Sequence, residues 1–363
     1  MTPRELVIRT LNHQPVDRAP RDLWVSPAVE TGSPEELAEV NLRYPSDIVA
    51  AEFIYPSARR AAAKTARDSV LVDAWGCAWQ ITARGPSVIV GDPPLAQSGK
   101  VNGFVPPAEV LDPARYAKVN RACQTTSRFV LARTDVRPFD RLRALRGAQR
   151  SVIDLARGSK EIRRLLEAIH QHNCRQIELW AGVDVDGVEI RDDWGTEEGS
   201  ILPLSLWRQL FRPLYAEYCR ILREHDKFVF FHSAGNITDL FGDLVKIGCD
   251  AIHTQWSLVK FDRLVQRFRG SVTFWGGVYS QQTLGSGTPE QVREAAHGKL
   301  LIQRFGFGRD EKQRGTDVRQ PAGARRVGNA AADPASGRRL GAFFPAERRA
   351  QDDSDHEPHR GGE

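Results

Sequence analysis

Apolar residues occur along this chain in short runs separated by longer amphipathic stretches, a pattern typical of strands that alternate with helices. The short apolar runs predict strands at 128–132, 186–190, 228–231, 251–255 and 271–277. Apolar residues three and four positions apart predict helices at 138–147, 160–183, 204–225, 237–247, 260–268 and 288–303. Because strands and helices follow one another in turn, the pattern indicates parallel strands joined by crossover helices in an α/β fold.

The first 125 residues begin with this pattern and then depart from it. Helices are expected at 3–14 and 34–43, and strands at 21–25 and 47–53. Residues 56–125 alternate apolar and polar positions with glycine and proline between them, as antiparallel hairpins do, and we interpret them as an insertion. About seven strands of the parallel type favour an eight-stranded (β/α)8 TIM-type barrel over a doubly wound sheet.

The C-terminal segment 309–363 lacks any such pattern. It is rich in Arg, Ala, Gly, Pro and Asp and has hardly any aliphatic residues, a composition that does not build a core. We therefore divide the chain into a barrel at 1–308 and an aberrant tail, with the eighth strand missing. Two explanations are open, a disordered extension of an incomplete barrel and a shifted reading frame near 304–310, of which we favour the second.

The composition fits a soluble globular protein, with 41% hydrophobic and 27% charged residues. No apolar run approaches the ~20 residues that cross a bilayer, and the charged start lacks the apolar region of a signal peptide. We therefore expect a cytoplasmic protein with no membrane partner. The five cysteines are scattered without a Cys-x-x-Cys pair, which argues against disulfides and cysteine-rich zinc sites. The net charge of +5 comes without a concentrated basic face, so nucleic acid is not an expected partner.

In parallel α/β barrels the active site lies at the carboxyl ends of the strands. That rule selects Asp192 and Asp193, after the strand at 186–190, and His232, after the strand at 228–231, as candidate catalytic residues. The candidate substrate-binding residues near the other strand ends are Asp22, Trp24, Asp47, Asn236, Gln255 and Trp275. No residue is assigned as a metal ligand.

The two adjacent carboxylates are expected to face opposite ways, because neighbouring side chains of a strand point to opposite sides. One of Asp192 and Asp193 then faces the substrate as an acid, a base or a partner of His232, and the other hydrogen-bonds the turn. His232 has two interpretations, a functional imidazole at the barrel mouth and a residue that only bonds a neighbouring carbonyl. Its position at a strand end favours the first.

Several segments together resemble the uroporphyrinogen decarboxylase superfamily, which includes corrinoid-dependent methyltransferases. The segments are "MTPRELVIRTLNHQPVDRAPRDLW", "YPSDIV", "IRDDWGTEEGSILPLSLWRQLFRPLY", "FFHSAGNITDLFGDLVKIGCDAIHTQ" and "VTFWGGVYSQQTLGSGTPEQVRE". They follow one another in the family's order over residues 1–305. The resemblance implies a (β/α)8 barrel that binds tetrapyrroles, corrinoids or methyl donors at its mouth.

Two departures from the family's motifs bear on the reaction and on metal binding. Uroporphyrinogen decarboxylase carries an arginine-rich RQAGRY motif that holds the substrate's carboxylates, whereas the stretch "RDLWVSPAVE" here offers only Arg21 nearby. Zinc-dependent methyltransferases of the superfamily use a His-x-Cys pair and a later cysteine. Here His232 is followed by Ala234 in the cysteine position, and no cysteine follows Cys249. Zinc is therefore not expected.

The resemblance then implies an enzyme that transfers a methyl group between a small methylated compound and a corrinoid protein. The corrinoid would be carried by that partner protein, and no resident cofactor is assigned. The alternatives are uroporphyrinogen decarboxylation in porphyrin biosynthesis and a non-catalytic barrel that binds a tetrapyrrole or a corrinoid protein. A small-molecule substrate and a corrinoid protein are the expected partners, and a homodimer is left open.

Deletion of residues 310–363 should leave the melting temperature nearly unchanged, because this segment has too little apolar surface to offset the entropy of ordering it. Thermal unfolding of the full chain and of the truncated chain measures the difference. A large drop in melting temperature after the deletion would show that the tail packs onto the barrel.

Overall fold

The computed structural model describes residues 1–25, 27–51, 53, 70–82, 85–277 and 287–294. The chain divides into two compact units, Met1–Arg325 and Arg326–Glu363, and every described residue belongs to the first. The tail predicted at 309–363 lies outside the described residues, so its interpretation stays a prediction.

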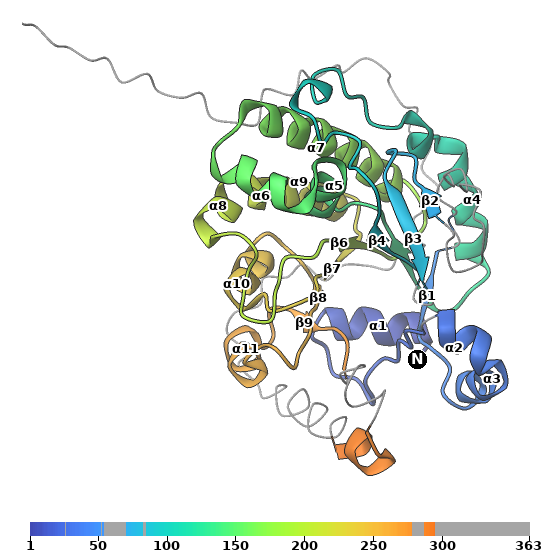
Figure 1. Ribbon diagram of the computed structural model, residues 1–363. Helices are drawn as coiled ribbons and strands as arrows, with labels where there is room; N and C mark the ends of the chain where they lie inside the picture. The colour runs from blue at the N-terminus through green and yellow to red at the C-terminus, as the bar shows by residue number, and fades with distance from the viewer. Residues whose placement is uncertain (26, 52, 54–69, 83–84, 278–286, 295–363) are drawn as a thin grey trace, which may run out of the picture. The chain divides into compact units, whose positions relative to one another are not determined.

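Parallel strands form the central sheet of the first unit (Figure 1). The sheet has six strands whose order in space is their order along the chain. They are β1 (Ile48–Ala50), β5 (Phe129–Arg133), β6 (Gly187–Arg191), β7 (Phe228–His232), β8 (Ala251–His253) and β9 (Thr273–Phe274). Every neighbouring pair is parallel, and the sheet curls into half of a barrel. The predicted α/β fold of the TIM type is confirmed.

Helices connect the strands and cover the outer face of the sheet (Figure 1). Those before β5 are α1 (Pro3–Leu11), α2 (Pro27–Gly32), α3 (Pro34–Arg43) and α4 (Pro113–Gln124). Those after β5 are α5 (Pro138–Arg146), α6 (Ala148–Ala156), α7 (Lys160–Ala181), α8 (Leu204–Leu210), α9 (Arg212–Glu224), α10 (Thr238–Lys246) and α11 (Phe261–Phe268). The helix predicted at 204–225 is split into α8 and α9, because Pro213 has no N–H to donate and its ring crowds the preceding turn. None of the helices in the described ranges is both long and apolar enough to cross a bilayer.

Helix α1 closes the amino-terminal end of the strands. Thr2 and Glu5 form a reciprocal capping box at its start, which satisfies two backbone N–H groups that the first turn leaves without a partner. Its buried face contributes Val7, Ile8 and Leu11 to a core cluster with inward residues of the strands. The strand residues are Ile48, Phe129, Leu131, Phe228, Phe230 and Ala251, and Trp275, which directly follows β9, also belongs to the cluster. The lower part of the barrel is therefore an apolar core.

The prediction of a strand at 21–25 is wrong. These residues have no regular secondary structure, and Asp47 N donates a single backbone hydrogen bond to Arg21 O at 2.8 Å. The segment is held instead through the side chain of Asp22, which accepts a hydrogen bond from Trp275 Nε1, and through the ring of Trp24, which packs on His232 and His253. An apolar five-residue run alone does not distinguish such a segment from a strand.

Residues 70–82 and 85–89 of the insertion predicted at 56–125 form the expected antiparallel hairpins, whereas its last part is the helix α4 and not a hairpin. Strands β2 (Val70–Val72), β3 (Ala78–Thr82) and β4 (Gly85–Ile89) form a separate antiparallel sheet. Arg141 of α5 ties it to the barrel, because its buried guanidinium pairs with Asp73 of the insertion and with Asp135 after β5. Two short 3-10 turns, Ser98–Lys100 and Ala108–Leu111, lead on to α4.

The start predicted for the last helix is also confirmed. Thr288 Oγ1 accepts a hydrogen bond from Gln291 N, and Gln291 Oε1 accepts one from Thr288 N at 2.8 Å. The predicted continuation of this helix beyond residue 294 lies outside the described residues.

Candidate active site

The inward-facing residues change from apolar to polar toward the carboxyl ends of the strands. On β7 the inward positions are Phe228, Phe230 and then His232, since alternate residues share a face. The parallel register places Arg191 of β6 and His253 of β8 beside His232. A polar layer therefore lies above the apolar core, at the end of the barrel where parallel α/β enzymes place their active sites.

His232 is buried within this layer. Its ring stacks on that of His253, with centroids 4.7 Å apart and an angle of 7° between the rings. Trp24 lies against both rings, at centroid distances of 5.5 Å and 4.8 Å. Burial first, and then the charge of Arg191, hold the pKa of His232 well below its ordinary value, so the imidazole is neutral at pH 7. Its Nδ1 is buried and has no hydrogen-bond partner among the residues that the structure describes.

Asp22 fixes the two tryptophans of the mouth. Its Oδ2 accepts hydrogen bonds from Trp24 Nε1 at 2.7 Å and from Trp275 Nε1 at 3.0 Å, and the two indoles meet edge to face at 4.9 Å. The structure therefore gathers three of the predicted substrate-binding residues around His232, although the segment that carries Asp22 and Trp24 is not a strand.

The two adjacent aspartates face opposite sides, as expected. Asp192 is fully buried in the helix layer, where its carboxylate accepts hydrogen bonds from Phe139 N at 2.7 Å, Asp140 N at 2.8 Å and Tyr215 Oη at 2.6 Å. Burial, followed by the charge of Asp140, raises the pKa of Asp192 well above its ordinary value. Asp192 thus holds the start of α5 and the side of α9, and it does not face the mouth.

Asp193 is the aspartate that faces His232. Its Oδ1 lies 3.9 Å from His232 Nε2 and accepts a hydrogen bond from Ala234 N at 2.8 Å. Its side chain is 43% exposed, which leaves it accessible to a ligand. Geometry therefore favours Asp193 over Asp192 for a direct role, and that role stays a prediction.

Gln255 and Asn236 both hold the loop after β7. Gln255 Oε1 accepts a hydrogen bond from Gly235 N at 2.8 Å. Asn236 Oδ1 accepts from the N and Oγ1 of Thr238, which opens α10. Asn236 therefore holds the turn that leads into α10, whereas we expected it to contact substrate. The side chain of Gln255 fixes the shape of the loop at the mouth.

Asp47 lies at the opposite end of the barrel, which corrects its assignment to the substrate site. It precedes β1, and Arg18 donates to its two carboxylate oxygens at 2.6 Å and 2.7 Å. Although burial works against ionisation, the hydrogen bonds from Arg18 and from Arg21 N lower the pKa of Asp47. This carboxylate fastens the segment after α1 to the sheet.

The sequence reasoning missed two inward residues of β6. Glu189 is buried, and Arg133 Nε lies 3.7 Å from its Oε2. Burial raises the pKa of Glu189 against the opposing charges of Arg191 and Arg133. Arg191 is exposed at the end of the same face. A strict count of alternate positions backwards from Asp193 would have found both residues.

The loops after β6 and β7 touch through their backbones. A Cβ atom at Gly195 or at Gly235 would overlap the backbone of the other loop. Gly195 N donates to Ala234 O at 3.1 Å, and Asn236 N donates to Thr196 O at 2.7 Å. Gly235 also has a φ of +76°, which side-chain-bearing residues rarely adopt.

The residues around His232 do not make a zinc site of the family type. Among the described residues, no group of three or more His, Cys, Asp or Glu side chains is placed to hold a metal ion. Ala234 stands where a thiolate would be needed, and the ring of His253 is stacked on His232 instead of converging with it. A structural or catalytic zinc normally takes three or four protein ligands, so we derive no step through a metal.

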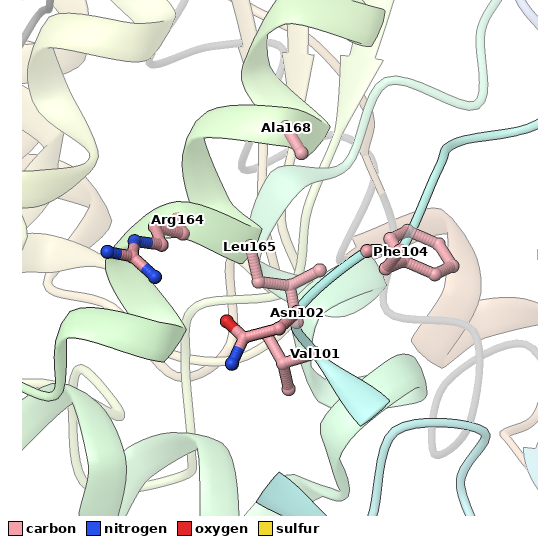
Figure 2. Close-up of a pocket in the computed structure, with 7 residues that line it drawn as sticks. Val101, Asn102, Phe104, Arg164, Leu165 and Ala168 are labelled. Carbon is pink, nitrogen blue, oxygen red and sulfur yellow. The ribbon is translucent and has the colours of Figure 1, made fainter. Parts of the chain in front are cut away.

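A separate hollow of about 360 Å³ lies between the turn at 101–104 and α7 (Figure 2). Val101, Phe104 and Leu165 give it an apolar wall, and Arg164 is the one ionisable residue of its lining. It does not include any residue of the barrel mouth. Its lining carries no pair of groups suited to acid–base chemistry.

Comparison with known proteins identifies the family. The family model described as "Uroporphyrinogen decarboxylase (URO-D)" matches residues 109–308, which is more than half of the chain. The chain belongs to the uroporphyrinogen decarboxylase family. A solved structure of a methyltransferase from Methanosarcina mazei is similar to this URO-D family chain, with a TM-score of 0.62 and 15% sequence identity. The match covers 84% of this chain and 90% of the other, and it shows a shared fold. No functionally curated protein matches the chain.

The substitution Gly235→Ala should lower the free energy of unfolding by about 3 kcal/mol or more, since it adds a steric overlap to an unfavourable backbone conformation. The matched control is Gly270→Ala, where φ is +74° but nothing lies within 4 Å of the added Cβ. That control should lose only about 1 kcal/mol. Urea unfolding measures both variants, and equal losses would contradict the tight crossing of the two loops.

Substitutions of the two aspartates should separate architecture from function. Asp192→Ala leaves two backbone N–H groups and the Tyr215 hydroxyl without their acceptor, so the free energy of unfolding should fall by about 3 kcal/mol or more. Asp193→Ala removes one acceptor beside solvent and should change it by less than about 1 kcal/mol. Urea unfolding again provides the measurement. The reverse order of the two losses would show that we have exchanged their roles.

Proposed function

We propose that this URO-D family protein transfers a methyl group between a small methylated compound and a corrinoid carried by a partner protein. The observation that carries the proposal is the indole of Trp24 against His232, held by Asp22, which also accepts a hydrogen bond from Trp275. An indole wall and a neutral imidazole suit a small, weakly charged compound better than a porphyrinogen with many carboxylates. The methyltransferase from Methanosarcina mazei, which has the same fold, supports this choice.

Methyl transfer of this kind requires a proton to be added to, or removed from, the heteroatom that carries the methyl group. When the methyl leaves, the bonding electron pair stays on the heteroatom, which then takes up a proton, and the acceptor supplies the pair for the new bond. In the reverse direction the heteroatom loses that proton. A positioned acid or base accelerates either direction by about 10²–10⁴-fold.

His232 and Asp193 are the groups placed for this task. A carboxylate near Nε2 favours the tautomer with its proton on Nε2, which leaves Nδ1 as a buried acceptor without a partner among the described residues. Nδ1 can take the proton of a substrate hydroxyl, thiol or ammonium group and return it. The depressed pKa makes the imidazolium a ready donor for that return.

Decarboxylation of uroporphyrinogen is the second candidate. The description of the matching family model favours it, as do the inward arginines Arg133 and Arg191, which could hold carboxylates. Against it, Arg133 is already paired with Glu189, and Asp22 and Trp24 occupy the segment where the decarboxylase motif would supply arginines.

The test is an assay with free cobalamin, reduced to its Co(I) form, as the methyl acceptor. We expect the absorbance of the reduced corrinoid to disappear with one class in a panel of O-, N- and S-methylated compounds. His232→Ala and Asp193→Ala should lower that rate by about 100-fold or more, because each removes a proton-handling group. Reversed-phase chromatography of the methylated corrinoid provides a second measurement.

The matched control is His225→Ala, because His225 ends α9 at the far end of β7 and bonds only a local carbonyl among described residues. It should keep the wild-type rate. If the protein converts uroporphyrinogen to products with fewer carboxylates and forms no methylated corrinoid, the decarboxylase hypothesis replaces this proposal. Binding of a corrinoid with neither reaction would support a non-catalytic barrel.

A further inference from the structure

Arg191 occupies a position at the mouth that the proposed reaction does not use. It is the last residue of β6 and lies in register with His232 on β7. Side chains in register on parallel neighbours share a face, so Arg191 projects from the inward face of the barrel. Adjacent strands lie about 4.8 Å apart, and one small molecule can therefore touch both side chains.

The charges around Arg191 are already engaged with other groups. Glu189 is approached by Arg133 Nε at 3.7 Å, and Arg133 also lies 5.5 Å from the centre of the Trp24 ring. Asp22 accepts hydrogen bonds from two indole N–H groups, and Asp193 accepts one from Ala234 N. Arg191 itself makes no ion pair or hydrogen bond with any residue in the described part of the chain. Its charge opposes the burial that raises the pKa of Glu189 and adds to the burial that lowers the pKa of His232, but no carboxylate in the described part of the chain is bonded to it.

We propose that Arg191 binds an anionic group of the substrate, so that the mouth selects a small methylated carboxylate. The planar guanidinium matches a carboxylate with two parallel hydrogen bonds. The apolar body of the ligand lies against Trp24, and its heteroatom is within reach of His232. This inference takes the location of the site from the proposed function and adds the charge class of the compound.

The burial of the neighbouring groups supports this assignment. His232 is only 6% exposed and Glu189 only 2%, so the protein already excludes water from the groups beside Arg191. A ligand bound to the guanidinium would exclude water from its open side. An ion pair gains strength when water is excluded from it. A neutral ligand of the same shape would leave the guanidinium covered and unpaired, which costs affinity.

Titration calorimetry with benzoate and its neutral analogue benzamide tests the inference without any methyl acceptor. Wild-type protein should bind benzoate about tenfold or more tightly than benzamide, the effect of one hydrogen-bonded charge pair. Arg191→Gln should remove that preference, and Arg191→Lys should restore part of it, because lysine keeps the charge but loses the fork of donors. The matched control Arg121→Gln changes an exposed arginine of α4 and should keep the full preference.

Three results would overturn the inference: no benzoate binding, equal binding of the two ligands to wild type, or an undiminished preference in Arg191→Gln. Unchanged melting temperatures confirm that the variants fold. The outcome is separable from that of the proposed function. If Arg191→Gln loses the benzoate preference but the wild-type protein transfers no methyl group to cobalamin, the anion site alone is supported. Methyl transfer from neutral compounds at the same rate in Arg191→Gln would leave the proposed function standing and remove this inference.

Discussion

The contact between the backbones of Gly195 and Gly235 is the constraint on which the mouth of this barrel depends. It brings the loops after β6 and β7 closer than any side chain would allow. At that separation Ala234 O accepts a hydrogen bond from Gly195 N, and Ala234 N donates a hydrogen bond to Asp193 Oδ1. Asp193 is therefore placed by main-chain bonds on two loops, and His232 by the register of β7. A site positioned by backbone contacts keeps its geometry better than one that depends on long side chains.

The alternation of strands and helices could be predicted from sequence because strands covered on both faces give continuous apolar runs. The runs "FVFF" and "GVEI" became β7 and β6 within a residue of the expected bounds. The same rule failed at 21–25, where the segment is held by hydrogen bonds that the carboxylate of Asp22 accepts from two indole N–H groups. It also could not separate α8 from α9, since apolar spacing continues through the break before Pro213.

The site was predictable to the extent that strand ends locate it. His232, Asp193, Asp22, Trp24 and Trp275 do come together, because the carboxyl ends of parallel strands share one edge. Asp47 failed because it lies at the amino end of its strand, both in the predicted strand 47–53 and directly before β1, whereas the site lies at the carboxyl ends. Choosing between Asp192 and Asp193 needs the direction of β6, which a run of apolar residues alone does not give.

The contrast between the two halves of the barrel interior indicates what the polar half is for. Below, Phe228 and Phe230 fill the space with apolar side chains against α1. Glu189 of β6 is already level with Phe230, and above it the same faces carry Arg191 and His232. The buried ionisable groups of Glu189 and His232 have pKa values shifted toward the neutral form. A buried polar atom without a partner costs about 1–3 kcal/mol, and apolar packing in its place is often neutral or stabilising. Stability therefore does not account for His232, and sites that depart from the rules of stable packing are usually functional. Buried or inward ionisable side chains are concentrated where His232, Glu189 and Arg191 adjoin. We therefore expect the proposed substrate's heteroatom and its charged group to bind at the ends of β6 and β7.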